Sequence, residues 1–467
     1  MRRHLHKFET TFWLVVKTIL YLLLLATFIV TMGQENIGLT RPSRMLAITG
    51  TTFVVVGLLF LNVYGTYDVG RRKSRPIIYS LLLAAGCTDV ITYIQLMIMR
   101  VNNTLTRRFS FTSISFLVLT FLIQMLIIML FTYAGNWLFF RMHDPEQCCI
   151  ITDSQESLDE IVFAIQNYKK QYRIASVADY HSKNLQEMIK NVDTVFAFNV
   201  PLKYRAEILD WCYEYQVNIY FNPDIEDIIE LNAEQYVLDD EMLMNKNVKS
   251  LTIGQRIAKR LIDIGLSIIL GILSSPFWIG GMIAVKVYDG GPVIYKQVRA
   301  TIHGRRFYVY KIRTMKEDAG MYSVTKDDDR ITPPGRFLRR TRIDEIPQLW
   351  NVLKGEMSFV GPRPEMISNI EAYTEELPEF NYRLRVKAGL TGYAQIAGKY
   401  NTTPRDKLIM DMMYIEQFSI LRDLQLIFQT AVVLLRRDST EPFEDRGHCG
   451  YTFEKWEDKD KKQDQES

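Results

Sequence analysis

Four long apolar segments occupy the first 141 residues and constrain the fold more than any other feature of the sequence. They cover about residues 12–32, 45–65, 77–99 and 111–139. A helix of about 20 apolar residues crosses a hydrocarbon core of about 30 Å. Because a helix satisfies its backbone hydrogen bonds within the segment, it is the form that such a segment takes in a bilayer. The sequence therefore predicts four transmembrane helices.

The basic residues predict how these helices are oriented. Arginine and lysine are more frequent in residues 1–7 and in the loop 70–76 than in the two opposite loops, which carry Arg41, Arg44, Arg100, Arg107 and Arg108. Cytoplasmic loops carry an excess of such residues. An even number of crossings then returns the chain to the cytoplasm at Arg141.

One acid, Asp89, lies in the middle of the third apolar segment. A carboxyl group in a membrane is costly and is a functional candidate for that reason. The favoured interpretation is helix packing, with a threonine or tyrosine as the partner of Asp89.

Charge and cysteine content exclude two classes of function. The formal net charge is +3 over 467 residues, so no broad basic surface for nucleic acid is expected. The cysteines have no metal-ligand spacing; they are Cys87, Cys148, Cys149, Cys212 and Cys449. A reduced chain that faces the cytoplasm is the simplest interpretation.

Residues 147–240 alternate between strand and helix patterns. The predicted strands are Gln147–Thr152, Arg173–Val177, Val192–Phe198 and Val217–Phe221, with helices at Ser157–Tyr172 and Ala206–Gln216. Such alternation predicts a parallel sheet. The turn at 152–157 has no glycine and carries Asp153 and Glu156, which would repel a pyrophosphate. We therefore expect a Rossmann-like domain with a scaffold or homodimer role rather than a bound dinucleotide, followed by a linker at 241–255.

The apolar segment 261–287 is long enough to span a bilayer, but Ser275 and Pro276 interrupt it. Proline removes a backbone hydrogen bond and kinks a helix. Basic residues flank both ends of the segment, so both ends favour the cytoplasmic face. These features predict a broken, re-entrant membrane helix. The alternative is a fifth, kinked span, which would place residues 290–467 on the outside.

Two adjacent acids, Asp344 and Glu345, follow a cluster of arginines and precede Pro347. Proline favours the first turn of a helix, so the acids are expected at the start of a helix at 347–353. The helix end and the arginines should keep a carboxylate ionised near a phosphate. A carboxylate can form a covalent phosphoryl intermediate, whereas the alternative role is a simple helix cap.

The strings around these acids resemble the bacterial sugar transferases, the monotopic phosphoglycosyl transferases, over about residues 256–437. The matching strings are KIRTM at 311–315, RRTRIDEIPQLWNVLKGE at 339–356, MSFVGPRPE at 357–365, GLTGYAQ at 389–395, DMMY at 411–414 and SILRD at 419–423. The resemblance implies transfer of a sugar-1-phosphate from a UDP-sugar to undecaprenyl phosphate, in the bacterial inner membrane, with release of UMP. Together with the apolar segments and the Rossmann-like domain, it implies the long, hexose-specific form, which would start exopolysaccharide, capsule or O-antigen assembly.

The resemblance also assigns roles to single residues. It implies that Asp344 is the nucleophile and that Glu345 assists it. It assigns substrate contacts to five further positions, Lys311, Arg313, Arg363, Asp411 and Asp423, and it matches Ser275-Pro276 to the break of a re-entrant helix. A diphosphate substrate implies Mg²⁺, with Asp344 and Glu345 as ligands. The acidic turn Asp327-Asp328-Asp329 is an alternative metal site that we regard as a solvated loop.

Two other function classes compete with this one. A scaffold or regulator with a relic catalytic domain is disfavoured by the intact acids and basic residues, and a polytopic transferase would need more spanning helices. The sequence has no signature that names the hexose, although galactose and glucose are the first candidates.

The predicted parts are a four-helix transmembrane region (1–141), a Rossmann-like α/β domain (142–250), a re-entrant helix in contact with membrane lipids (251–289), an α/β catalytic domain (290–440) and a charged tail (441–467).

Overall fold

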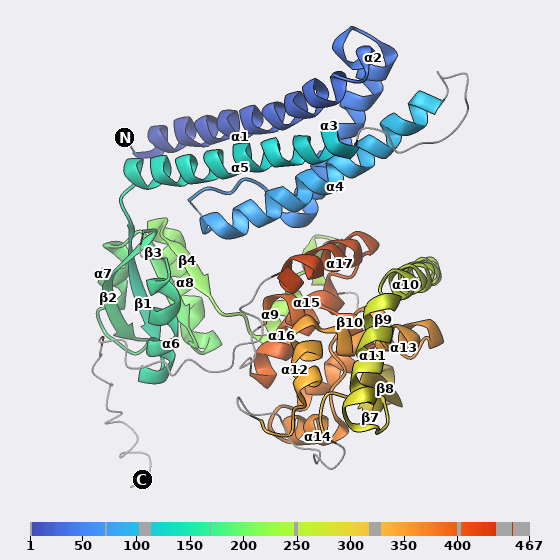
Figure 1. Ribbon diagram of the computed structural model, residues 1–467. Coiled ribbons are helices and arrows are strands. Elements are labelled where there is room, and N and C mark those ends of the chain that lie inside the picture. Colours follow the sequence, from blue (N-terminus) through green and yellow to red (C-terminus); the bar gives the residue numbers. More distant parts are fainter. Residues whose placement is uncertain are drawn as a thin grey trace. The chain divides into compact units, whose positions relative to one another are not determined.

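The computed structural model in Figure 1 describes residues 2–70, 72–101, 114–168, 170–246, 251–316, 328–398, 403–435 and 451. The chain divides into two compact units, Met1–Asn222 with Arg446–Ser467, and Pro223–Asp445. Some predicted features lie outside the described residues. They are the loop positions Arg71, Arg107 and Arg108, the acidic position Asp327, and the tail 441–467 apart from Tyr451.

Long apolar helices form the first part of the first unit: α1 (Arg2–Gly33), α3 (Arg44–Tyr64), α4 (Ser74–Val101) and α5 (Ile114–Met142), with the short α2 (Ile37–Thr40) after α1. The four long helices each have the length and composition to cross a membrane, which confirms that the four predicted apolar segments are helices. Helices α1, α5 and α4 lie side by side in Figure 1. Leu14, Leu58 and Leu130 are 62%, 60% and 68% exposed, as expected for side chains that face lipid.

The intramembrane acid Asp89 lies inside this bundle and is 1% exposed. Gln124 of α5 donates from Nε2 to Oδ1 of Asp89 at 3.2 Å. The same amide donates to the Leu24 carbonyl of α1 at 3.1 Å. The partner is therefore a glutamine, not the threonine or tyrosine that we expected, and the contact joins three helices.

A parallel sheet of order β2-β1-β3-β4 follows in the first unit. Its strands are β1 (Glu146–Thr152), β2 (Tyr172–Asp179), β3 (Thr194–Phe198) and β4 (Asn218–Phe221), and its helices are α6 (Gln155–Gln166), α7 (Leu185–Lys190) and α8 (Leu202–Tyr215). Ile150 packs with α6 on one face, and Ile151 packs with α7 and α8 on the other. The predicted parallel sheet is confirmed. Helix α7 was not predicted because its 6 residues are too few to show a helical period.

The boundary between the units lies after Asn222, not near residue 250 as the sequence indicated. Helix α9 (Ile225–Glu230) inserts Ile228, which is 2% exposed, into a core of the second unit that contains Phe380 and Leu408. An exposed antiparallel hairpin of β5 (Glu234–Leu238) and β6 (Glu241–Asn245) follows it. Residues 241–245, which we expected in a linker, are thus a strand.

Helices α10 (Ile253–Leu273) and α11 (Ser275–Asp289) form the predicted broken helix, with a bend of 61° between them. The Ser275 hydroxyl donates to the Ile272 carbonyl at 2.7 Å, an acceptor that has no N–H four residues on because that residue is Pro276. The Ser274 hydroxyl donates at 2.5 Å to the Leu270 carbonyl, which also accepts the Ser274 backbone N–H. Pro276 stands in the first turn of α11, where a missing N–H costs little. This shape suits a kinked span or a re-entrant loop, so re-entry stays a prediction.

The remaining elements of the second unit surround the acid pair. In chain order they are β7 (Ile294–Ala300), η1 (Ile302–Gly304), β8 (Arg306–Ile312), α12 (Pro333–Thr341), η2 (Ile343–Glu345), α13 (Gln348–Lys354), β9 (Ser358–Val360), α14 (Ile367–Glu376), η3 (Pro378–Arg385), β10 (Gly389–Thr391), α15 (Tyr393–Ala397), α16 (Pro404–Glu416) and α17 (Ile420–Leu435). Strands β7 and β8 pair antiparallel, and β9 and β10 pair parallel. The predicted helix at 347–353 is α13, but the acid pair lies in the separate 3₁₀ turn η2.

Candidate active site

The acid pair lies in a turn that neighbouring apolar side chains hold in place. Helix α12 ends at Arg342, whose φ of 54° is left-handed and reverses the chain into η2. Leu338 and Ile343, on either side of this reversal, pack against α11 and β8. Asp344, which follows Ile343 in this turn, is consequently only 8% exposed.

Glu345 is clamped by two cations from other elements. Lys311 of β8 donates from Nζ to Oε1 of Glu345 at 2.8 Å. Arg363, in the loop after β9, donates from Nη2 to the same oxygen at 2.7 Å. Burial alone would raise the pKa of Glu345, but the charges and hydrogen bonds of Arg363 and Lys311 outweigh it and hold the pKa well below its usual value. Glu345 is therefore ionised at neutral pH.

Asp344 has the opposite environment. Among the described residues it forms no ion pair, whereas Glu345 forms two. Burial, followed by the negative charge of Glu345, raises the pKa of Asp344 to about 6, and the charges of Lys311 and Arg339 only partly oppose this. The basic residues, which we expected to keep this carboxylate ionised, thus lower the pKa of Asp344 by less than burial raises it. At neutral pH Asp344 is still mostly ionised, and it is the carboxylate without a fixed cation.

The side chain of Arg363 has donors left for an anionic ligand. It is 43% exposed, compared with 16% for Glu345. Its backbone carbonyl accepts from Nη2 of Arg383 at 2.9 Å, which holds the loop. A guanidinium can bind a carboxylate and a phosphate oxygen at once through its planar donors. The structure thus brings together Asp344, Glu345, Lys311 and Arg363, four of the predicted site residues.

The other three predicted substrate contacts have internal partners. Arg313 is buried and donates to Asp289 at 2.7 Å and to the Pro292 carbonyl at 2.6 Å, so it joins α11 to β8. Asp411 is 1% and Asp423 4% exposed. The contacts of Arg313 and the burial of the two acids favour a positioning role for all three residues over the direct substrate contact that we predicted.

Each buried acid has a cation that sequence reasoning did not single out. Arg383 pairs with Asp411 at 2.7 Å and also supports the Arg363 backbone. Lys259 of α10 pairs with Asp423 at 2.5 Å and donates to the Val360 carbonyl at 3.0 Å. The motifs place the acids, but their partners lie 28 and 164 residues away in the chain. The available signal for Lys259 was the polar stripe of α10, in which Arg256, Lys259 and Asp263 recur at helical spacing in an otherwise apolar helix.

Gly361 and Gly389 bring two backbone segments together. A Cβ on Gly389 would lie 2.1 Å from the Gly361 nitrogen, and one on Gly361 would lie 2.3 Å from the Lys387 carbonyl oxygen. Glycine has no Cβ and so permits such a close approach of two backbones. The approach joins the segments of β9 and β10 next to the Arg363 loop.

The residues fit a magnesium ion only in combination with substrate oxygens. Within the described ranges, no group of three or more metal-type side chains is present. Of the alternative acidic turn, Asp328 forms an ion pair with Arg330. Mg²⁺ is commonly held by one or two carboxylates plus phosphate oxygens. Asp344 and the unclamped oxygen of Glu345 match that pattern.

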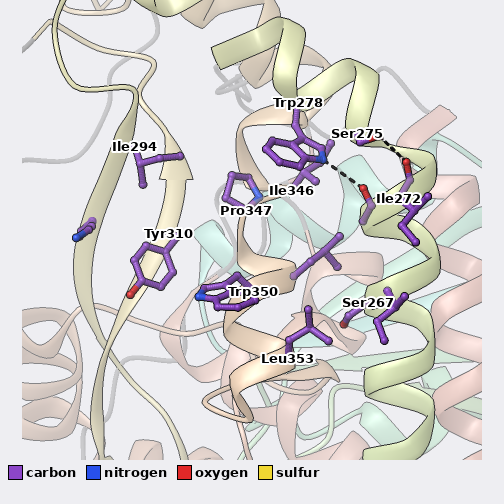
Figure 2. A pocket seen from close by; sticks show the side chains of 14 residues that line it. Ser267, Ile272, Ser275, Trp278, Ile294, Tyr310, Ile346, Pro347, Trp350 and Leu353 are labelled. Atoms are coloured by element: carbon purple, nitrogen blue, oxygen red, sulfur yellow. Dashed lines mark hydrogen bonds between the residues drawn. The ribbon is translucent and has the colours of Figure 1, made fainter. Parts of the chain in front are cut away.

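A large apolar cavity lies beside Ile346 and Pro347, the residues that follow the acid pair (Figure 2). Its volume is about 800 Å³. Ile346 and Pro347, the two residues after Glu345, form part of the wall, and α10, α11, α13, β7 and β8 supply the rest. The charged cluster of Glu345, Lys311 and Arg363 therefore lies close to an apolar cavity, and the helix pair α10–α11 forms part of that cavity's wall.

The combination of an acid pair, two cations and an apolar cavity on a membrane-type helix pair suits a membrane-associated enzyme, and comparison with known proteins gives its family. The family model for bacterial sugar transferase matches residues 254–437. A UDP-glucose:undecaprenyl-phosphate glucose-1-phosphate transferase of Caulobacter vibrioides is 36% identical over 189 residues, which are 39% of this chain and 71% of the relative. The chain therefore belongs to the bacterial sugar transferase family and is an enzyme.

Two other relatives show how far the similarity extends. An undecaprenyl-phosphate galactose phosphotransferase of Salmonella typhimurium is 38% identical over 204 residues, 40% of this chain and 42% of the relative. The galactosyl transferase CpsE of Streptococcus agalactiae is 29% identical over 386 residues, 72% of this chain and 81% of the relative. The similarity to CpsE thus continues beyond the region that the family model matches.

Proposed function

We propose that this enzyme transfers a hexose-1-phosphate from a UDP-sugar to undecaprenyl phosphate. The observation that carries the proposal is the unequal acid pair, in which Asp344 is buried without a cation and Glu345 is clamped by Lys311 and Arg363. The Caulobacter and Salmonella relatives are named for reactions of that type.

The first step forms a covalent intermediate on Asp344. A carboxylate oxygen attacks the phosphorus that bears the sugar, and the bond from that phosphorus to the bridging oxygen breaks. The bridging oxygen keeps the electron pair and leaves as part of UMP. Arg363 and Lys311 lie close enough to Glu345 to hold phosphate oxygens beside it. Bound Mg²⁺, held by Asp344 and Glu345, would neutralise charge on the diphosphate.

The second step restores the carboxylate. A phosphate oxygen of undecaprenyl phosphate attacks the phosphorus of the Asp344 adduct, and the bond from phosphorus to the aspartyl oxygen breaks. The product is the undecaprenyl diphosphate sugar, which starts the repeat unit of an exopolysaccharide, a capsule or an O-antigen. Dividing one difficult displacement into two suits a single nucleophile that meets its two substrates in turn.

The proposal is tested by incubating the purified protein with a panel of UDP-sugars. With undecaprenyl phosphate and Mg²⁺, we expect steady UMP release with UDP-glucose or UDP-galactose, matched by a lipid-linked sugar phosphate. Without the lipid, UMP release should stop after about one equivalent of enzyme. Release of UDP instead of UMP would mean transfer of the sugar alone and would contradict the proposal.

The first step should depend on the protonation of Asp344. Only the carboxylate is nucleophilic, so with a pKa of about 6 the active fraction falls from about nine-tenths at pH 7 to about one-tenth at pH 5. The UMP burst rate at low UDP-sugar, measured without the lipid phosphate, should fall accordingly. Arg339→Gln removes a positive charge that favours the ionised form of Asp344, so the fall in the burst rate should occur at a higher pH in this variant. A flat profile from pH 5 to 7 would remove Asp344 from the role.

We further propose that α10 and α11 form a re-entrant loop in the bacterial inner membrane, with the catalytic residues on the cytoplasmic face. Single cysteines at Gln255 and Tyr288, in a cysteine-free background, should both react with an impermeant maleimide only from the cytoplasmic side. The hydrogen bond from the Ser275 hydroxyl to the Ile272 carbonyl supports this proposal, because Pro276 leaves that carbonyl without its helical N–H donor. Labelling of position 288 from the outside would indicate a fifth span.

A further inference from the structure

The cavity beside the acid pair has the character of a lipid site. Its wall combines apolar side chains of α10, α11 and α13, including Ile272, Trp278 and Trp350 (Figure 2). A cavity of about 800 Å³ lies in the size range of sites that enclose an organic ligand. Outside the cavity, the same helix pair presents Leu273 and Phe277 at 67% and 63% exposure. The apolar wall is thus continuous with a surface suited to hydrocarbon.

Polar groups at this cavity indicate that its occupant is not purely hydrocarbon. Ser267 lines the cavity and is 1% exposed, and its hydroxyl has no hydrogen-bond partner among the described residues. At the β7–β8 wall, Lys296 lies over the Tyr310 ring, and Lys354 donates to the Tyr310 hydroxyl at 3.1 Å. Cations next to an apolar space fit an anionic amphiphile better than a neutral one.

We propose that this cavity binds the isoprene units of the polyprenyl phosphate that lie nearest its phosphate. The inference rests on the proposed function. Ile346 and Pro347 form part of the wall and follow Glu345 directly, so a chain in the cavity has its head within reach of Asp344. The cavity then selects the acceptor, while the donor binds at the charged side of the site.

Gly271 of α10 offers a way to fill the cavity without disturbing the helix. It lines the cavity, and apart from its two chain neighbours and the backbone of its own helix, no atom of the described residues lies within 4 Å of where its Cβ would be. Gly265, on the same helix, has equally open space but does not line the cavity. Gly271→Leu and Gly265→Leu are therefore matched: both replace a helical glycine in α10 by leucine, and only the first occupies the proposed lipid site.

The two half-reactions separate the acceptor from the donor. Gly271→Leu should slow discharge of the Asp344 adduct by undecaprenyl phosphate at least about tenfold more than it slows adduct formation from the UDP-sugar. Gly265→Leu should slow neither step. Trp350→Ala, which removes a wall, should act in the same direction as Gly271→Leu and keeps the test open if that variant fails to fold. Equal losses in both steps, or no loss, would overturn the proposal.

A binding experiment identifies the occupant without turnover. A prenyl phosphate with a photoreactive diazirine on its first isoprene units should label peptides from residues 267–278 and 346–353 of the full chain, and Gly271→Leu should abolish this labelling. Labelling of these peptides by a diazirine phospholipid only would overturn the assignment. If the wild type labels as expected but never releases UMP, the lipid site stands and the proposed reaction fails.

Discussion

Replacing Asp344 by asparagine should abolish both the UMP burst and the phosphosugar adduct. Asparagine keeps the shape of the buried side chain, which is 8% exposed, but it has no nucleophilic oxygen. Loss of a nucleophile typically costs about 10⁴-fold or more in turnover. The measurement is mass spectrometry of the protein after incubation with UDP-sugar alone, together with UMP release. An adduct that persists in the variant, on any residue, would contradict the assignment.

Glu345→Gln is the matched comparison for that result. The amide keeps the size of the side chain but removes the charge that Lys311 and Arg363 clamp. We expect slower adduct formation, because the two cations lose their common anchor, but an adduct on Asp344 should still accumulate. Thermal unfolding of both variants in detergent checks that each retains the fold. Complete loss of adduct in both variants would leave the nucleophile undecided between the two acids.

Replacing Arg383 by methionine should destabilise the second unit severely. Arg383 is 3% exposed and pairs with Asp411, which is 1% exposed, at 2.7 Å. Removing one partner of a buried ion pair typically costs about 3–5 kcal/mol, because the other charge stays buried and unpaired. The measurement is thermal or denaturant unfolding of the full chain in detergent. Activity should fall as well, since Arg383 also holds the Arg363 backbone at 2.9 Å.

The double variant Arg383→Met/Asp411→Leu separates a buried charge from lost packing. It removes both charges and should recover much of the stability.

The single variant should also show a pH signature. Burial raises the pKa of Asp411 even against Arg383, so without the arginine the folded protein binds a proton that the unfolded chain releases. Stability relative to the wild type should then improve as the pH falls. A deficit that is the same at every pH would indicate packing alone.

Much of the fold follows from local sequence. The four apolar helices, the parallel strands from β1 to β4 and the broken helix at Ser275-Pro276 were predicted because each is encoded by a run of neighbouring residues. Length, period and proline position decide these features without distant contacts. The acid pair was found for the same reason, since Asp344, Glu345 and their arginines are close in the chain.

The domain boundary shows where local reasoning ends. Residues 223–245 continue the polar and apolar alternation of the preceding domain, yet α9 belongs to the second unit. What places it there is the burial of Ile228 against Phe380 and Leu408, which are more than 150 residues further along. No pattern within the segment specifies that surface, because hydrophobic burial is not directional and does not depend on neighbours in sequence.

By itself the sequence determined which chemical groups this enzyme has and which segments are long and apolar enough to cross a membrane. Only the tertiary structure decided the environment of each group. Asp344 and Glu345 are adjacent carboxylates, and their different environments come from Lys311 and Arg363, which lie 34 and 18 residues away from Glu345. The same is true of Asp411 and Asp423, whose motifs look functional but whose charges are taken up by Arg383 and Lys259. Electrostatic interaction depends on distance and burial in space, and only the folded chain sets these.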